Sequence, residues 1–112
     1  MASDTQSIAL SPLTISTGPG HQKAPALSTD GSDYFVVWTD YRNHKNSQAD
    51  IYGARIDGSN GMNLDPGGFV IEEASFNQQE ATVIHAQGRQ WVMWRSWVGT
   101  GEWEGSYIAG KT

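Results

Sequence analysis

The stretch YFVVW at residues 34–38 decides the fold class of this chain. It is apolar at five consecutive positions, and WVMW at residues 91–94 repeats the pattern. Short apolar runs without alternation, rich in β-branched and aromatic residues, are typical of strands buried on both faces. Glycine-containing dipeptides such as Asp30-Gly31 punctuate the runs, and no window has apolar residues at helical spacing over three turns. The sequence therefore predicts an all-β protein of short strands.

The same run also reveals an internal repeat. Residues 22–38 recur at 79–94, with Gln22 and Gln79 57 positions apart and Trp38 and Trp94 56 positions apart. This difference predicts that one residue has been lost from the second hairpin turn. The flanks repeat as well, because Leu-Ser-Pro at 10–12 resembles Leu-Asp-Pro at 64–66, and Tyr-Gly-Ala at 52–54 loosely resembles Tyr-Ile-Ala at 107–109. We therefore expect a single unit over residues 1–112 that contains two repeats, about 8–57 and 62–110.

Each repeat is expected to contribute four short antiparallel strands joined by turns. The predicted strands are 13–16, 24–28, 34–39 and 50–56 in the first repeat, and 69–72, 81–85, 90–95 and 106–109 in the second. The strand at 69–72 should return beside the strand at 50–56 and pair with it. The strand at 106–109 has no such return, so we expect residues 13–16 to pair with it, within one chain or between chains.

Three motifs of the first repeat resemble a known family. They are VVW followed by Asp40 and Arg42, DIYGARI at residues 50–56, and LDPGG at residues 64–68. Together they resemble a bacterial β-propeller repeat that usually occurs in tandem in extracellular proteins. The resemblance is weaker in the second repeat, where Ser96 stands in place of Asp40. It implies two four-stranded antiparallel propeller blades and an extracellular location, but no single activity.

A propeller ring typically contains about four to eight blades. Two blades are therefore expected to complete a ring by homo-oligomerisation, because each repeat buries its faces only against neighbouring repeats. A trimer, with six blades, is the first expectation. The alternative is that the two sheets pack directly as a small sandwich.

Composition excludes several classes of partner. The net charge of −5, without any Lys or Arg cluster, would repel a phosphate backbone, so nucleic acid is not an expected partner. The longest apolar run is five residues, far below the roughly 20 that a membrane helix needs, so no membrane span is expected. The chain shows no signal-peptide pattern, and its lack of cysteine leaves the compartment open.

Most charged and polar motifs have a structural interpretation. Asp40 and Arg42 are expected to form a local salt bridge, since the second repeat lacks both charges. The acidic stretch at residues 57–65 lacks the terminal glutamate of a calcium-binding EF-hand and predicts a hairpin loop. The three histidines are isolated, and no nucleophile, base or metal set is apparent. We therefore expect no cofactor, no metal site and no enzymatic activity.

One stretch has a composition suited to ligand binding. Aromatic rings and carboxylates gather around a glycine-rich connection near the C-terminus, and the candidate residues are Trp97, Glu102, Trp103, Glu104 and Tyr107. Aromatic rings can stack on the apolar faces of sugars while carboxylates accept hydrogen bonds from hydroxyls. The same residue types are also enriched at subunit interfaces. The expected function is therefore a non-enzymatic, lectin-like binding module. A structural or protein-interaction propeller fragment is the alternative, and a glycoside-hydrolase-like propeller ranks last.

Overall fold

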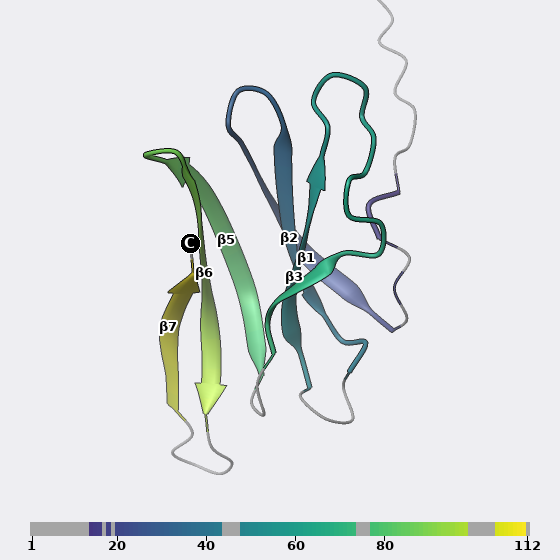
Figure 1. Cartoon of the computed structure of the whole chain (residues 1–112). Coiled ribbons are helices and arrows are strands. Elements are labelled where there is room, and N and C mark those ends of the chain that lie inside the picture. The colour runs from purple at the N-terminus through teal and green to yellow at the C-terminus, as the bar shows by residue number, and fades with distance from the viewer. Residues whose placement is uncertain are drawn as a thin grey trace, which may run out of the picture.

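The computed structural model of the chain describes residues 14–16, 18, 20–43, 48–73, 77–98 and 105–111, with the backbone alone at 97, 98 and 105–111. All regular structure in these residues is β-strand, which confirms the all-β prediction (Figure 1). None of the described elements is a helix that could cross a bilayer.

The strands form two antiparallel sheets. The first sheet has the order β1-β2-β3-β4, with β1 (Gln22–Thr29), β2 (Tyr34–Asp40), β3 (Asp50–Ile56) and β4 (Phe69–Glu72). The second has the order β5-β6-β7, with β5 (Gln78–Ala86), β6 (Arg89–Val98) and β7 (Gly105–Lys111). Seven of the predicted strands thus correspond to strands of these described ranges. The strand predicted at 13–16 is not formed within the described chain, because residues 14–16 have no strand conformation and pair with no described strand.

The return from β3 to β4 is confirmed. Tyr52 lies opposite Val70 and Gly53 lies opposite Phe69 in an antiparallel pair. Strand β4, which begins the second repeat in the sequence, is therefore the last strand of the first sheet. The boundary between the sheets consequently falls after the boundary between the repeats.

The register shows that the two hairpins are equally long. Gln22 lies opposite Asp40 in the first hairpin, and Gln78 lies opposite Ser96 in the second, so equivalent residues are 56 positions apart throughout. The predicted loss of one residue is therefore wrong, because Gln78 and not Gln79 is the counterpart of Gln22. The β-bulges also coincide, and their residues Ala24 and Glu80 both have positive φ, 56° and 62°.

The third strands align differently from the expectation. Trp38 lies opposite Tyr52, whereas Trp94 lies opposite Ala109, so Tyr52 corresponds to Ala109 and Gly53 to Gly110. The sequence match of Tyr52 with Tyr107 is therefore wrong by two residues. Because side chains alternate with a period of two along a strand, this error leaves the assignment of faces unchanged.

Each sheet has two faces, which we name by one residue of β2 or β6. In the first sheet, the Val37 face consists of Ala26, Phe35, Val37, Ile51 and Ile71, and the Trp38 face consists of Leu27, Val36, Trp38, Tyr52 and Ala54. In the second sheet, the Met93 face consists of Thr82, Ile84, Trp91 and Met93, and the Trp94 face consists of Ala81, Val83, Val92 and Trp94.

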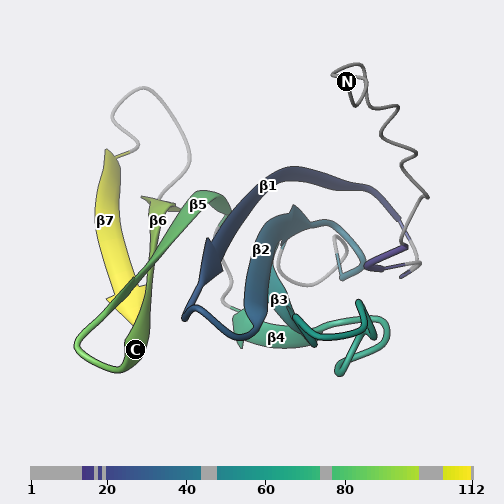
Figure 2. The ribbon, with the colours of Figure 1, turned by 90° about the horizontal axis from the view of Figure 1, so that it is seen from above.

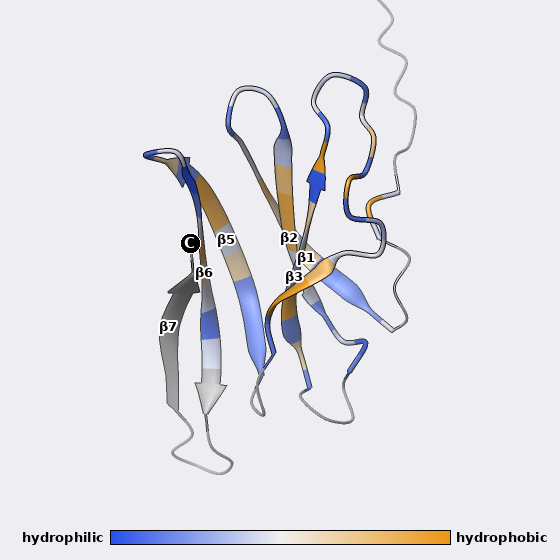
Figure 3. Ribbon diagram, in the orientation of Figure 1, coloured by the Kyte–Doolittle hydropathy of each residue, from blue (hydrophilic) through white to orange (hydrophobic). Residues whose placement is uncertain are grey.

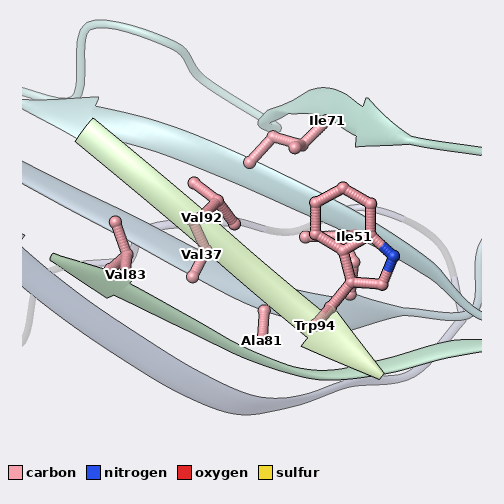
Figure 4. Packing of buried hydrophobic residues seen from close by; sticks show 7 residues of the cluster. All are labelled: Val37, Ile51, Ile71, Ala81, Val83, Val92 and Trp94. Atoms are coloured by element: carbon pink, nitrogen blue, oxygen red, sulfur yellow. The ribbon is translucent and has the colours of Figure 1, made fainter. Parts of the chain in front are cut away.

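The two sheets pack through unlike faces. The Val37 face of the first sheet contacts the Trp94 face of the second, and this contact forms the main hydrophobic cluster (Figure 4). Strand β5 lies next to β1 and β2 in both views (Figures 1 and 2). Since Val37 is the counterpart of Met93, and Trp38 of Trp94, the repeats stack head to tail. Figure 3 shows hydrophobic residues on β2, β3 and β5, and Val37, Ile51, Ala81 and Val83 of these strands belong to this cluster.

Candidate functional site

A cavity of about 520 Å³ opens between the two sheets, at the end where the β1–β2 and β5–β6 turns lie. Phe35 and Phe69 line it as a stacked pair, with ring centroids 6.0 Å apart and an angle of 11° between the ring planes. Arg89 and Gln90 of the second sheet line the opposite side. Because residues of both repeats contribute, the pocket exists only where the two sheets meet.

Several apolar side chains of this pocket are open to solvent. Tyr34 is 41% exposed, Phe69 39% and Val70 46%. Adjacent large apolar side chains that remain exposed on a folded surface are typical of ligand-binding or protein-binding sites. The pocket thus presents apolar surface to solvent at this end of the molecule's described part.

Charged groups stand at fixed positions around these side chains. Asp30 Oδ1 accepts hydrogen bonds from the backbone N–H groups of Ser32 and Asp33, both at 2.8 Å. The bonds from Asp33 and Ser32 hold the pKa of Asp30 below its usual range, so this carboxylate is negatively charged at neutral pH. Arg89 supplies a positive charge, and it forms no ion pair with any residue that the structure describes.

Hydrogen bonds hold two side chains of the pocket wall, Arg55 and Gln90, in place. Arg55 donates two hydrogen bonds to the carboxylate of Asp65, at 2.8 and 2.9 Å, and this partner raises the pKa of Arg55. Ser28 Oγ donates a hydrogen bond to Gln90 Oε1 and so joins the first sheet to the second. These bonds fix the side chains before a ligand arrives, which lowers the entropy cost of binding.

The Asp40–Arg42 pair is a structural contact, which confirms the predicted salt bridge. Asp40 is fully buried, and Arg42 donates to both of its carboxylate oxygens at 2.9 and 2.8 Å. Burial by itself raises the pKa of Asp40, but hydrogen bonds from Arg42 and Trp38 outweigh it and hold the pKa below its usual range. The Arg42 guanidinium also lies 4.0 Å from the ring centroid of Tyr52 and donates to Gly67 O.

The LDPGG motif closes over this pair. Gly68 has a φ of +83° and lies so close to Trp38 that an added Cβ would be 2.6 Å from Cζ2 of its indole ring. Glycine is therefore required both by the backbone conformation and by the contact. Residues of these two family-like motifs thus contact each other and help to hold the first sheet together.

The acidic loop at residues 57–65 is a hairpin loop, as predicted. Asp57, Asn60 and Asn63 each accept a backbone N–H two residues further along, from Ser59, Met62 and Asp65. Within the described part of the chain, no cluster of His, Asp or Glu could hold a metal ion. The oxygens that resemble calcium ligands in the sequence instead shape the loop.

The predicted binding residues are only partly within the described structure. Trp97 and Tyr107 lie on β6 and β7, where the backbone is described, and Tyr107 is opposite Ser96 while Trp97 is opposite Ser106. Glu102, Trp103 and Glu104 lie outside the described residues. The backbones of Trp97 and Tyr107 are therefore neighbours, at the end of β6 opposite to the pocket.

Sequence reasoning missed the pocket between the sheets. Its residues come from the β1–β2 turn and from β2, β3, β4 and β6, which are far apart in the sequence. The available signal was the apolar pair Phe69-Val70 directly after the two glycines of LDPGG, because a four-residue strand at a sheet edge cannot bury both residues.

Comparison with known proteins adds no relative, because no family model, curated protein or solved structure matches the chain. The functional argument therefore rests on the geometry of the site.

Proposed function

We propose that this chain is a pair of β-propeller blades that serves as a non-enzymatic binding module, with a carbohydrate bound in the pocket between the two sheets. The observation that carries the proposal is the pocket itself, where exposed aromatic and apolar side chains lie beside fixed charged groups.

The blade arrangement is supported by the way in which the repeats stack. The four-stranded first sheet packs its Val37 face on the Trp94 face of the second sheet, and the Trp94 face is the counterpart of the Trp38 face. Successive blades of a propeller meet in this way, because each blade presents one face forward and the other backward. A sandwich formed by a two-fold operation would bring equivalent faces together.

The pocket has the chemistry that a sugar ring requires. The C–H faces of a sugar can lie on the exposed ring of Phe69, which stacks on Phe35, as aromatic side chains offer large apolar surfaces. Hydroxyl groups can donate to Asp30 and accept from Arg89 at the rim. The cavity volume of about 520 Å³ lies within the roughly 300–1,000 Å³ that is usual for small-molecule sites.

The carboxylates of the pocket favour binding over hydrolysis. A glycosidase needs a general acid whose pKa is raised, so that it holds a proton at neutral pH. The pKa of Asp30 is instead lowered by backbone hydrogen bonds. Asp33 Oδ1 accepts the backbone N–H of Gly58 at 3.1 Å and so braces the loop.

A glycan array followed by titration calorimetry tests the proposal. Phe69→Ala and Arg89→Ala should each weaken binding of the selected glycan by roughly tenfold or more, a loss of about 1.4 kcal/mol. Met62→Ala is the matched control, because Met62 is 59% exposed and lies outside the pocket, and it should bind as the unmodified protein does.

Two outcomes contradict the proposal. If no glycan binds, the carbohydrate assignment is wrong. If a glycan binds equally well to the Phe69 and Arg89 variants but is lost in Trp103→Ala, the site is the stretch predicted from the sequence and not the pocket.

A further inference from the structure

Each sheet has one face that the contact between the two sheets leaves uncovered, and each of these faces has a large apolar side chain exposed to solvent. Leu27 on the Trp38 face is 58% exposed, whereas its counterpart Val83 on the Trp94 face is 5% exposed. On the Met93 face, Ile84 is 50% exposed. Hollows of about 290 and 400 Å³ also lie on the Trp38 face, on either side of Ile15. The Trp38 face is the counterpart of the Trp94 face, and the Met93 face is the counterpart of the Val37 face. Both of these counterparts are buried in the contact between the two sheets.

Residues 14–16 lie where a neighbouring blade would begin. Ile15 packs against the cluster of Trp38, Tyr52 and Ala54, and its counterpart 56 positions further along, Ile71, packs in the cluster that contains Trp94. Asn63 Nδ2 donates a hydrogen bond to the carbonyl oxygen of Ile15, which fixes this placement. The segment thus covers the Trp38 face as β4 covers the Trp94 face.

The outer edge of β7 is the edge with which such a segment could pair. Strand β3 pairs with β2 on one edge and with β4 on the other, but β7, its counterpart, pairs with β6 alone among the described strands. An edge of this kind presents a row of backbone N–H and C=O groups that can accept another strand.

We propose that a second copy of this chain docks head to tail, with the Met93 face of one copy on the Trp38 face of the next. In this contact, residues 14–16 of the second copy add to β7 of the first as its fourth strand. The inference rests on the blade arrangement proposed above, and it identifies the partner and the contact surface.

The internal register gives the register of this contact. Val70 lies opposite Tyr52 and Glu72 lies opposite Ile51 in the pairing of β4 with β3. The equivalent pairs between copies are Thr14 opposite Ala109 and Ser16 opposite Ile108. Within the chain, the Val37 face packs on the Trp94 face. The Met93 face and the Trp38 face are the counterparts of these two faces, so a second copy fits them better than an unrelated protein does.

Because this contact joins two different surfaces, it can repeat from copy to copy. A ring of three copies would contain six sheets, within the usual range of about four to eight blades. In light scattering, the protein should therefore have a mass that is a small multiple of 12.2 kDa, with three copies expected.

Disulfide crosslinking tests the register, since the chain contains no cysteine. Equimolar Thr14→Cys and Ala109→Cys single variants, mixed and oxidised, should give a disulfide-linked dimer, because directly opposite residues have suitably close Cα atoms. The matched control replaces Thr14→Cys with Met62→Cys, on an exposed loop outside both faces, and should give no comparable dimer.

Charge substitutions test the faces. Ile84→Lys and Leu27→Lys should each reduce the mass to a single chain while circular dichroism shows unchanged strand content, since both side chains are exposed within one copy. If the wild-type protein remains a monomer at micromolar concentration, the proposal is wrong, and the two faces bind something other than a second copy. An oligomer that persists in both variants shows that the faces are wrong.

The same samples separate this proposal from the binding function. Monomeric Ile84→Lys that still binds glycan would leave the pocket assignment in place, since neither substituted residue lines the pocket. A double variant Thr14→Cys/Ala109→Cys that oxidises only within single chains would overturn docking between copies.

Discussion

The indole Nε1 of Trp38 donates a hydrogen bond to Oδ2 of Asp40, at 2.8 Å and two residues further along the same strand. The counterpart Trp94 donates instead to Gln78 Oε1, at 2.9 Å and on the neighbouring strand. Both indole N–H groups are buried and satisfied, but only the first repeat uses a carboxylate, which also holds Arg42.

We predict that Asp40→Asn lowers the free energy of unfolding by roughly 2–3 kcal/mol, somewhat less than for a fully buried pair because Arg42 is part exposed. The side chain of Arg42 loses its charged partner while it remains held against Tyr52. Urea unfolding at neutral pH measures the loss. As a control, Asp65→Asn at the more exposed Arg55 pair should cost less than about 1 kcal/mol. Equal losses would show that burial does not distinguish the two pairs.

The same carboxylate predicts a dependence of stability on pH. The folded-state pKa of Asp40 lies below the ordinary aspartate value of 3.8, so its contribution is fully present above that value. The contribution is lost as the pH falls through the lowered pKa, because the unfolded state then binds the proton more readily. Urea unfolding from pH 7 to pH 3 should show a shallower decline for Asp40→Asn than for the wild type. Parallel declines would contradict the assignment.

The bulge at Ala24 predicts a stabilising substitution. Ala24 has a φ of 56°, a conformation that costs an alanine roughly 1 kcal/mol but costs glycine little. Ala24→Gly should therefore raise the melting temperature by a few degrees. In contrast, Gly31→Ala should lower stability by roughly 1 kcal/mol through the backbone alone. Gly31 has a φ of +94°, and no atom lies within 4 Å of an added Cβ.

The two kinds of tryptophan should respond differently to truncation. Trp94 is 3% exposed in the main cluster, so Trp94→Ala should cost about 3–5 kcal/mol and unfold much of the protein. Trp103→Ala should leave the fold intact and change ligand binding or the oligomeric state. Thermal unfolding followed by circular dichroism makes the comparison. Similar destabilisation by both substitutions would place Trp103 in the core.

Calcium should not stabilise the protein through the loop at residues 57–65. Its side-chain oxygens accept backbone N–H groups, and Asp65 is held by Arg55. Addition of millimolar calcium, or of a chelator, should leave the melting temperature unchanged. A calcium-dependent rise that Asp57→Asn abolishes would show that the loop binds the ion.

The hairpins could be predicted from the sequence because their signals are local. Apolar runs and glycine turns define β2 and β6 without reference to the rest of the chain. The exact equivalence of the repeats could not be predicted in this way, since Gln78 and Gln79 both match Gln22 by residue type and only the shared bulge aligns Gln78 with it. A bulge at Ala24 and Glu80 leaves no mark in the sequence, because neither residue favours positive φ.

The remaining errors concern contacts between distant segments. The strand predicted at residues 13–16 rests on their match to β4, but a strand needs a partner, and within one chain the described residues provide none. The pocket depends on how far the two sheets separate at one end, which brings Phe69 near Arg89. That separation follows from packing between the sheets and has no local signature.

Head-to-tail stacking has no built-in stopping point. If the rotation between successive sheets adds up to a full circle, the assembly closes; if it does not, the same contact produces an open filament. The small residue Ala81, only 8% exposed in the cluster between the sheets, helps to set their separation and hence that rotation. A larger side chain at this single position therefore acts on the shape of the whole assembly, because each copy repeats the altered angle.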